Sequence, residues 1–215
     1  MIGIMLPTYK RPHALQRVAT NIEQATKHPF KLYFGLEPDD TEGIKAAKAT
    51  GHEVIINKYS SDAGYANTIQ TIYEATSEPL LFHANDDFLF VDGWDETPVA
   101  MFDTDWVQVV GVKQQEGDNS RSAIFMFRRK YIEDQSGVVD MPNRVFYPYH
   151  HNYQDTEFTQ TAQARGVWAA CDAPCILHQH PAILGLNDKD ATYLKNDATA
   201  SADEETFKRR KHLWA

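Results

Sequence analysis

The chain has 215 residues and a formal net charge of -9. This length suits one well-buried domain and is short for two. The acidic balance argues against a general polyanion-binding surface, because non-specific affinity for nucleic acid comes from Lys and Arg side chains that neutralise phosphates. No apolar run approaches the ~20 residues of a membrane-spanning helix, and the N-terminal segment lacks the basic region of a signal peptide, so we expect a cytoplasmic protein.

Strand and helix patterns alternate along residues 1–90. Short apolar runs predict strands, and apolar side chains that recur at helical spacing predict helices between them. We expect Thr41 to cap the second helix and Gly51 to end it. Such an alternation predicts a parallel sheet with helices on both faces. The predicted strands are 2–6, 31–36, 54–56 and 80–83, and the predicted helices are 13–27, 41–49 and 64–75.

The pattern changes in the second half of the chain, where two strands flank a polar loop and predict a smaller antiparallel addition. The fold class predicted for the whole chain is therefore α/β, with a mostly parallel central sheet. Cys171 and Cys175 form a single cysteine pair, which favours buried thiols over a zinc site. The predicted elements are strands at 106–112, 123–127, 167–170 and 175–178, and helices at 155–165 and 202–213.

Residues 80–94 are the most informative stretch, because a short apolar strand runs directly into Asn85, Asp86 and Asp87. Ligands bind at the carboxyl ends of strands in an open α/β sheet. Two adjacent carboxylates that lack basic neighbours repel each other unless a cation or hydrogen-bond donors compensate. A hard divalent ion that bridges to a diphosphate would compensate them. The alternative is a solvated turn with an acidic lip.

Polar residues also follow the first two predicted strands. After the first, Tyr9 can face a flat base, and Arg11 can meet a phosphate or pair with an acid. After the second, Glu37 opens an acidic turn over 37–40 and can accept hydrogen bonds from a uracil or a ribose. The same acids could instead be favourable charges at the start of the next helix.

These loops, together with the helix start at 64–67 and the Gly-Trp pair at 93–94, resemble family 2 glycosyltransferases of the Rossmann-like GT-A fold. The resemblance covers residues 1–100 well and the remainder more loosely. It implies one domain with a nucleotide-sugar-binding half over 1–100 and an acceptor and catalytic half over 101–187. A C-terminal helical tail over 188–215 would follow.

In that family an Asp-x-Asp motif binds the diphosphate of a nucleotide sugar through Mn²⁺ or Mg²⁺. The resemblance implies that Asp87 ligates the metal, that Asp86 is the middle residue and that Asn85 replaces the first acid. Arg11 belongs to the same predicted nucleotide-sugar site, and Asn67 is implied to lie beside the nucleotide. The residues implied to line the base and ribose pocket are Pro7, Thr8, Tyr9 and Glu37.

The segment 154–158 is similar to a later motif of the family, in which an acid pair opens a helix and supplies the catalytic base of inverting enzymes. Gln154 stands in place of the usual Glu, so the resemblance implies that Asp155 is the base. A carboxylate near the anomeric carbon could take a proton from an acceptor hydroxyl. The alternative makes Asp155 a helix N-cap, with Glu157 as a favourable charge in the first turn.

Two groups of histidines complete the candidate site. His178 and His180 lie on one face of a late strand, at a spacing that suits metal ligation. The resemblance implies a late His as a further metal ligand, and we expect His180 rather than His178, although such a pair can also be surface groups. His150, His151 and Tyr153 precede the predicted base and suit acceptor binding, or could form a packed loop.

The sequence therefore predicts a metal-dependent, inverting glycosyltransferase with a nucleotide sugar, preferably a UDP-sugar, as its partner. It resembles small phage-encoded members of the family, for which a hydroxymethylated pyrimidine in DNA is one possible acceptor and the host cytoplasm the location. The basic clusters 128–130 and 208–211 could meet phosphates, whereas the net charge opposes DNA binding. The alternatives are a nucleotidyltransferase and a non-catalytic nucleotide- or sugar-binding module, for which Asp155 would have no use.

Overall fold

The computed structural model describes residues 1–114, 123–179 and 191–214. Within them, eight strands form one sheet in the order β3-β2-β1-β4-β7-β6-β8-β5. The strands are β1 (Ile2–Thr8), β2 (Phe30–Leu36), β3 (Glu53–Ile56), β4 (Leu80–His83), β5 (Phe88–Phe90), β6 (Val109–Gln114), β7 (Phe125–Arg128) and β8 (Trp168–His178).

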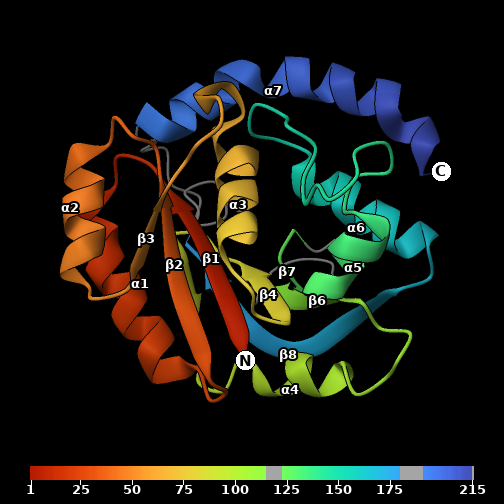
Figure 1. Ribbon diagram of the computed structural model, residues 1–215, viewed down its shortest axis with the longest axis horizontal. Helices are drawn as coiled ribbons and strands as arrows, with labels where there is room; N and C mark the ends of the chain where they lie inside the picture. The colour runs from red at the N-terminus through yellow and green to blue at the C-terminus, as the bar shows by residue number, and fades with distance from the viewer. Residues whose placement is uncertain (115–122, 180–190, 215) are drawn as a thin grey trace.

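Helices cover both faces of this sheet (Figure 1). The α-helices are α1 (Pro12–Ala25), α2 (Thr41–Ala49), α3 (Gly64–Ala75), α4 (Glu96–Met101), α5 (Arg129–Gln135), α6 (Gln154–Ala164) and α7 (Ala191–Arg210). The short 3-10 helices η1 (Ser61–Ala63) and η3 (Lys211–Leu213) precede α3 and follow α7. No helix in the described ranges is long and apolar enough to cross a membrane.

The sheet is parallel in its first half and mixed in its second, as the sequence predicts. Strands β3, β2, β1 and β4 are parallel neighbours. Strand β7 runs antiparallel to both β4 and β6, so the predicted antiparallel addition is confirmed. The prediction of two late strands was wrong, because β8 continues through Pro174 with a shift of register against β6. A β-bulge accommodates the proline, which cannot donate to the ladder.

Two hydrophobic cores flank the sheet. Strand β1 shows how one strand serves both, since Ile4 and Leu6 face the core under α1, whereas Met5 faces the core under α3. Gly35 in β2 is required by the second core, because a Cβ atom there would lie 2.3 Å from the Thr68 side chain. Because Gly35 has no Cβ atom, α3 can pack closely on the sheet, and Thr68 reaches the carboxyl end of β2.

Three local predictions were wrong, each for a physical reason. The N-cap of α2 is Asp40 rather than Thr41, because the Asp40 carboxylate accepts a hydrogen bond of 2.9 Å from the Gly43 amide. Helices α4 and α5 were not expected, since 6 and 7 residues give too little periodicity to detect. Helix α7 begins at residue 191 rather than 202 and is 20 residues long.

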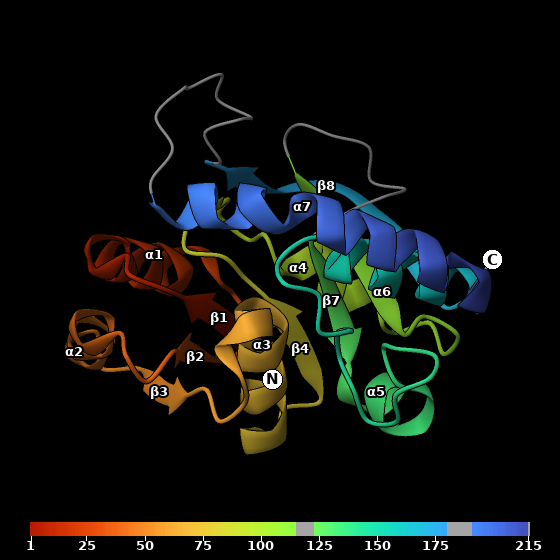
Figure 2. The same cartoon turned by 90° about the horizontal axis from the view of Figure 1, so that it is seen from above.

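Helix α7 lies across the edge at which the parallel strands β1, β2 and β4 end (Figure 1). The view from above shows it running across the molecule along α6, with α3 to one side (Figure 2). Ligands bind at the carboxyl edge of such sheets. Helix α7 therefore borders the place where a ligand is expected.

Candidate active site

A cleft with a volume of about 510 Å³ opens at the carboxyl edge of the sheet. Its size is within the range of about 300–1,000 Å³ that small-molecule sites occupy. Thr199 of α7 is part of its wall. The sequence-predicted site residues that line this cleft are Pro7, Thr8, Tyr9, Arg11, Glu37, Asn85, Asp86, Asp87, His150, His151, Tyr153, Asp155 and His178.

Two predicted residues are not placed there. Asn67 is buried, and it is absent from the residues that line the cleft. Its amide nitrogen donates to the Ser60 carbonyl at 2.8 Å, and its amide oxygen accepts from Arg144. Asn67 therefore supports the turn before Ser61, which does line the cleft, rather than facing a nucleotide. His180 lies outside the described residues.

The Asp86 carboxylate is held inside the protein. The Thr8 hydroxyl donates to one oxygen at 2.6 Å, and the Arg11 guanidinium pairs with the other at 2.8 Å. Arg17 donates to the backbone carbonyl of Asp86 at 2.9 Å. The expectation that this acid lacks basic neighbours was therefore wrong, since Arg11 arrives from the loop after β1. Burial raises the pKa of Asp86 and the charge of Asp87 adds to this, whereas Arg11 and Thr8 oppose the rise.

Asp87 faces His178 across the cleft, with 3.3 Å between Oδ2 and Nε2. The other ring nitrogen of His178 lies 3.2 Å from the amide oxygen of Gln114, which can only accept. In the tautomer that donates from Nδ1 to this oxygen, the Nε2 lone pair points at the carboxylate. Two acceptors this close are favourable when a proton or a cation lies between them.

This pair fits a divalent cation. Two neighbouring ligands of an octahedral ion with bonds of roughly 2.1 Å are roughly 3 Å apart, close to the separation of Asp87 and His178. A partner on Nδ1 is also what fixes the tautomer of metal-binding histidines. No group of three or more His, Cys, Asp or Glu that could hold a metal was found in the described part of the chain. Within the described residues only this pair is in place, so a cation here would need further ligands beyond Asp87 and His178.

A hydrogen-bonded chain of three side chains reaches the cleft and was not expected from the sequence. The Tyr65 hydroxyl lies 3.0 Å from both His83 Nδ1 and Asn85 Oδ1. Burial lowers the pKa of His83 to about 3, so its ring is neutral. The Phe125 amide donates to His83 Nε2 at 3.3 Å, which leaves Nδ1 to donate to Tyr65. Tyr65 in turn donates to Asn85, whose amide nitrogen remains available as a donor.

Tyr65 also lies within the electrostatic influence of three carboxylates. Burial raises the pKa of its hydroxyl well above the usual value, and the charges of Asp155, Asp87 and Asp86 raise it further. These acids come from the loop after β4 and from the first turn of α6, and all three line the cleft. The fold therefore brings the two acidic motifs of the sequence together in one cleft.

Asp155 lies in the first turn of α6, but it is not the helix cap. The cap position belongs to Tyr153, whose backbone is left-handed with a φ of 74° and whose side chain forms no cap bond. The Asp155 carboxylate accepts from the amide of Thr156 at 2.8 Å. Burial raises the pKa of Asp155, although these bonds to Thr156 oppose the rise. A raised pKa strengthens a carboxylate as a base.

Glu157, the other acid of this turn, has a structural role. Its side chain is only 1% exposed and does not line the cleft. Arg210 donates to its two oxygens at 2.8 and 3.0 Å, and the Tyr149 hydroxyl donates at 2.7 Å. These contacts commit both oxygens of Glu157 to the protein. Asp155 is therefore the acid of α6 that faces the cleft.

Glu37 keeps the position expected of a ligand-binding acid at the end of β2. Asn57 and Thr68 donate to the same carboxylate oxygen, Oε1, at 2.9 and 3.2 Å. The alternative use of these acids, at the start of a helix, applies to Asp40, which caps α2. Glu37 instead lines the cleft, buried to all but 7% of its surface.

Two buried polar residues of the opposite wall were missed as binding candidates. The amide oxygen of Gln154 and the amide nitrogen of Asn152 are buried without a hydrogen-bond partner among the described residues. Both residues line the cleft, and Gln154 is 6% exposed. Buried polar groups are almost always hydrogen-bonded in native proteins, so these atoms suit a polar ligand.

The two cysteines match the expected buried thiols. Cys171 and Cys175 form no disulfide and are buried in β8, and neither lines the cleft. The described residues form no metal-binding group of three or more around them.

No protein-family model matches the sequence, and no curated protein is similar to it. Solved structures share its fold. The chain is similar to glucosyl-3-phosphoglycerate synthase from Mycobacterium tuberculosis, solved with Mn²⁺, UDP and glucosyl-3-phosphoglycerate. The TM-score is 0.66 at 13% identity, over 86% of this chain and 75% of that chain.

Two further structures have the same architecture. The mannosyltransferase PcManGT from Pyrobaculum calidifontis, solved with GDP-Man and Mn²⁺, has a TM-score of 0.62 at 15% identity, over 81% of this chain and 55% of that chain. TarS from S. aureus has a TM-score of 0.61 at 14% identity, over 89% of this chain and 67% of that chain. At these identities the similarity shows the fold, which is the GT-A-type α/β fold that the sequence predicts.

Proposed function

We propose that the protein is a glycosyltransferase that moves a sugar from a nucleotide sugar, preferably a UDP-sugar, to an acceptor hydroxyl. The observation that carries this proposal is that Asp86, Asp87 and Asp155, which come from two separate acidic motifs, line one cleft. Such acids can serve a metal-bound diphosphate on one side and accept a proton on the other. The similar structures support the proposal, because two of them were solved with Mn²⁺ and either UDP or GDP-Man.

Asp87 and His178 are the described residues that would hold the divalent cation. When bound, Mn²⁺ or Mg²⁺ would neutralise the negative charge of the departing diphosphate. Asp86 has a different role, because its carboxylate is already occupied by Thr8 and Arg11. Asp86 keeps the loops after β1 and β4 together and thereby orients Asp87. His180 stays a prediction as a further ligand.

The nucleoside would lie against the ends of β1 and β2. Glu37 has one carboxylate oxygen, Oε2, that neither Asn57 nor Thr68 contacts, and this oxygen can accept from the N–H of a uracil or from a ribose hydroxyl. Asn85 offers an amide N–H, because its oxygen accepts from Tyr65. This N–H can donate to a ribose or phosphate oxygen. In family 2 glycosyltransferases, which the sequence resembles, the first acid of the motif stands at this position and accepts from ribose.

Asp155 would act as the general base. Its carboxylate takes the proton of the acceptor hydroxyl while that oxygen bonds to the anomeric carbon. The bond from the anomeric carbon to the diphosphate breaks in the same step, and its electron pair leaves with the nucleoside diphosphate. A single displacement of this kind inverts the anomeric configuration and needs no covalent enzyme intermediate.

The acceptor would bind against the wall formed by residues 150–154, which includes the predicted residues His150, His151 and Tyr153. Asn152 and Gln154 add the buried polar atoms that lack a protein partner. Their donors and acceptors suit an uncharged, hydroxyl-bearing acceptor.

A hydroxymethylated pyrimidine in DNA remains one acceptor to test, but the two basic clusters give it little support. Arg129 donates to the carbonyls of Glu78 and Tyr73, and Arg128 donates to that of Val107. Arg210 is buried in ion pairs with Asp140 and Glu157. Phosphate binding requires exposed cations, and in these clusters the arginines named are already used within the fold.

The proposed function is tested by incubating the protein with a panel of nucleotide sugars and Mn²⁺ and measuring the released nucleotide. We expect slow, metal-dependent release of a nucleoside diphosphate, with a UDP-sugar as the best substrate and no release after chelation. A parallel incubation with nucleoside triphosphates and sugar phosphates that releases pyrophosphate would instead indicate a nucleotidyltransferase. Binding of UDP without turnover of any donor, with or without candidate acceptors, would indicate a non-catalytic module.

The acceptor is tested with a radiolabelled donor. DNA that contains 5-hydroxymethylpyrimidines is compared with unmodified DNA and with small neutral glycosides. Transfer to the modified DNA alone, falling as salt rises, would establish the DNA acceptor. The acceptor wall favours the other result, in which the label is transferred to glycosides and none appears on the DNA.

A further inference from the structure

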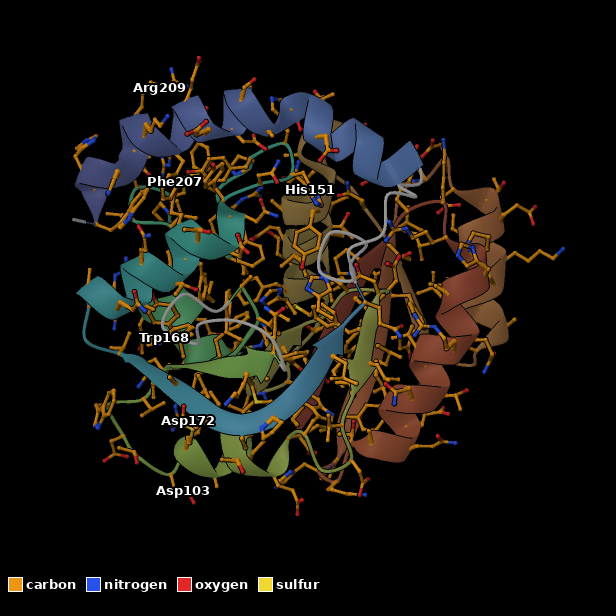
Figure 3. All side chains as sticks on the ribbon, turned by 180° about the vertical axis from the view of Figure 1, so that it is seen from behind. Asp103, His151, Trp168, Asp172, Phe207 and Arg209 are labelled. Carbon is orange, nitrogen blue, oxygen red and sulfur yellow. The ribbon has the colours of Figure 1, made fainter. Side chains whose placement is uncertain are left out.

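One face of α7 carries a row of residues that point into the molecule. Thr199, Asp203, Phe207 and Arg210 are spaced by three or four positions and therefore share a face. Thr199 lines the cleft, and Asp203 and Arg210 are buried. Figure 3 shows Phe207 on the side of α7 that faces α6 and Arg209 on the opposite side, with His151 beneath the helix.

Asp203 binds the backbone of the loop that forms the acceptor wall. Its carboxylate accepts from the amides of His150, His151 and Asn152, at 2.8, 2.9 and 2.8 Å. The Asp203 side chain is 2% exposed, so water does not compete for these bonds. Hydrogen bonds to an ionised acceptor are stronger than neutral ones, and three consecutive amides on one carboxylate fix the shape of a loop.

The same loop leads directly into the proposed base. Tyr153 follows the three bound amides, and its left-handed backbone, with a φ of 74°, turns the chain into α6. A conformation of this kind in a non-glycine residue persists only where its surroundings enforce it. The Tyr153 ring stacks on Phe207 at 4.8 Å between centroids, one turn of α7 beyond Asp203. Asp155 lies two residues after Tyr153 in the chain.

Arg210 supplies a separate anchor between the same two helices. Its ion pair with Glu157 fixes the buried side of the first turn of α6. Asp203 fixes the segment that leads into that turn. The first turn, and with it the carboxylate of Asp155, is therefore held by α7 from two directions.

We propose that Asp203 is a positioning residue, which through the loop 150–153 sets the geometry of the acceptor wall and of Asp155. This inference rests on the proposed function. It assigns to Asp203 a part in acceptor use rather than in donor binding, because its hydrogen bonds reach the loop 150–152 and none of those described reaches Glu37, Asn85 or Asp87.

The proposal is tested with Asp203→Asn and with Glu204→Gln as the matched control. Glu204 is the next residue of α7 and pairs at the surface with Lys208 at 2.7 Å. Asn has the shape of Asp but only one accepting oxygen and no charge. In Asp203→Asn we expect hydrogen exchange at the amides of 150–152 to accelerate by about tenfold or more, since a bond to a charged group typically shifts an opening equilibrium by that much. Glu204→Gln should leave these amides unchanged.

Function is measured on the same proteins. UDP affinity in the presence of Mn²⁺, followed by calorimetry, should be unchanged in Asp203→Asn, whereas kcat for nucleotide-sugar turnover should fall by about tenfold or more, because small displacements of catalytic groups have large effects. If Asp203→Asn fails to fold by circular dichroism, Phe207→Leu tests the same positioning, because it removes the stack on Tyr153 and keeps an apolar side chain. The same split between donor affinity and kcat is expected.

The outcomes separate this inference from the proposed function. Unchanged exchange at 150–152 in Asp203→Asn would overturn the inference whatever the activity of the protein. Accelerated exchange with an unchanged kcat would overturn the role in positioning Asp155. Absence of nucleotide-sugar turnover in the unmodified protein would count against the proposed function alone, because the exchange measurement would still report on the loop.

Discussion

The two walls of the cleft are held in place by different kinds of contact. On the donor side, Thr8 and Arg11 bind Asp86, and Asn57 binds Glu37. These residues lie at or just beyond the ends of parallel strands whose register is fixed by β1, β2 and β4. On the acceptor side, the loop 150–153 and the first turn of α6 are not continuations of parallel strands. Side chains of α7 hold them through Asp203 and Arg210.

Because their supporting contacts differ, the two walls can be perturbed separately. A strand end cannot shift without breaking ladder hydrogen bonds along the sheet, so the donor side is rigid by construction. The acceptor wall is fixed by a few side-chain contacts with buried charges, which are strong when complete and costly when one partner is lost. Substitutions in α7 should therefore affect acceptor use and stability while leaving nucleotide binding intact.

The largest effect should come from Asp155→Asn, which removes a base from the acceptor side. Base catalysis typically contributes about 10²- to 10⁴-fold, so turnover should fall by that order while UDP affinity is unchanged. Burial raises the pKa of Asp155, which means that its charge destabilises the folded state above that pKa. The neutral variant should therefore be at least as stable as the parent in urea. Retention of most of the turnover would refute the assigned base.

A large effect on stability is expected from Arg210→Ala, which removes the second anchor of the acceptor wall. Glu157 would remain buried without its ion pair, and breaking a buried pair typically destabilises by about 3–5 kcal/mol. The control is Arg209→Ala, because this neighbour is exposed and bonds only Thr206 in the described structure. Its effect should be within about 0.5 kcal/mol, as for most surface changes. Equal urea midpoints for the two variants would contradict the role of Arg210 as an anchor of the acceptor wall.

On the donor side, Asp87→Ala should weaken Mn²⁺-dependent UDP binding by about tenfold or more. Even the mutation of a residue that only hydrogen-bonds to a metal ligand typically lowers metal affinity by about 10- to 100-fold. His178→Ala should raise the Mn²⁺ concentration needed for half-maximal UDP binding, and His180→Ala provides the comparison for the other predicted ligand. Calorimetry with and without a chelator measures both effects. Equal UDP affinity in the two conditions for the parent protein would remove the metal site from the proposal.

The smallest effect concerns pH and again separates the walls. Asp155 must be unprotonated to act as a base, so turnover falls as the pH drops through its pKa. Because burial raises that pKa, the fall should occur at a higher pH than the value of about 3.9 for an ordinary aspartate. UDP affinity measured over the same pH range shows whether the donor side contributes to the fall. A turnover profile that merely follows UDP affinity would assign the titration to the donor side.

The strands and helices of the donor side could be predicted from the sequence alone. Strands β1 to β4 were predicted within two residues, and α3 was predicted with its observed bounds, because buried strands and amphipathic helices leave periodic apolar patterns. The meeting of the polar loops at one edge followed from the parallel order of these strands. Asp86 and Asp87 were therefore placed at the cleft before any contact was known, although the ion pair of Asp86 with Arg11 was not foreseen.

The acceptor wall and the place of His178 beside Asp87 could be read only from the tertiary structure. Helix α7 contacts the rest of the protein through the charged side chains of Asp203 and Arg210 as well as through Phe207. Its inner face therefore leaves little hydrophobic period, and the predicted helix over 202–213 missed residues 191–201. The pairing of β5 with β8 sets Phe88 opposite His178 and so brings that ring to Asp87. Alternation along a strand fixes which residues share a face, but their partners depend on the register between strands, which long-range packing selects.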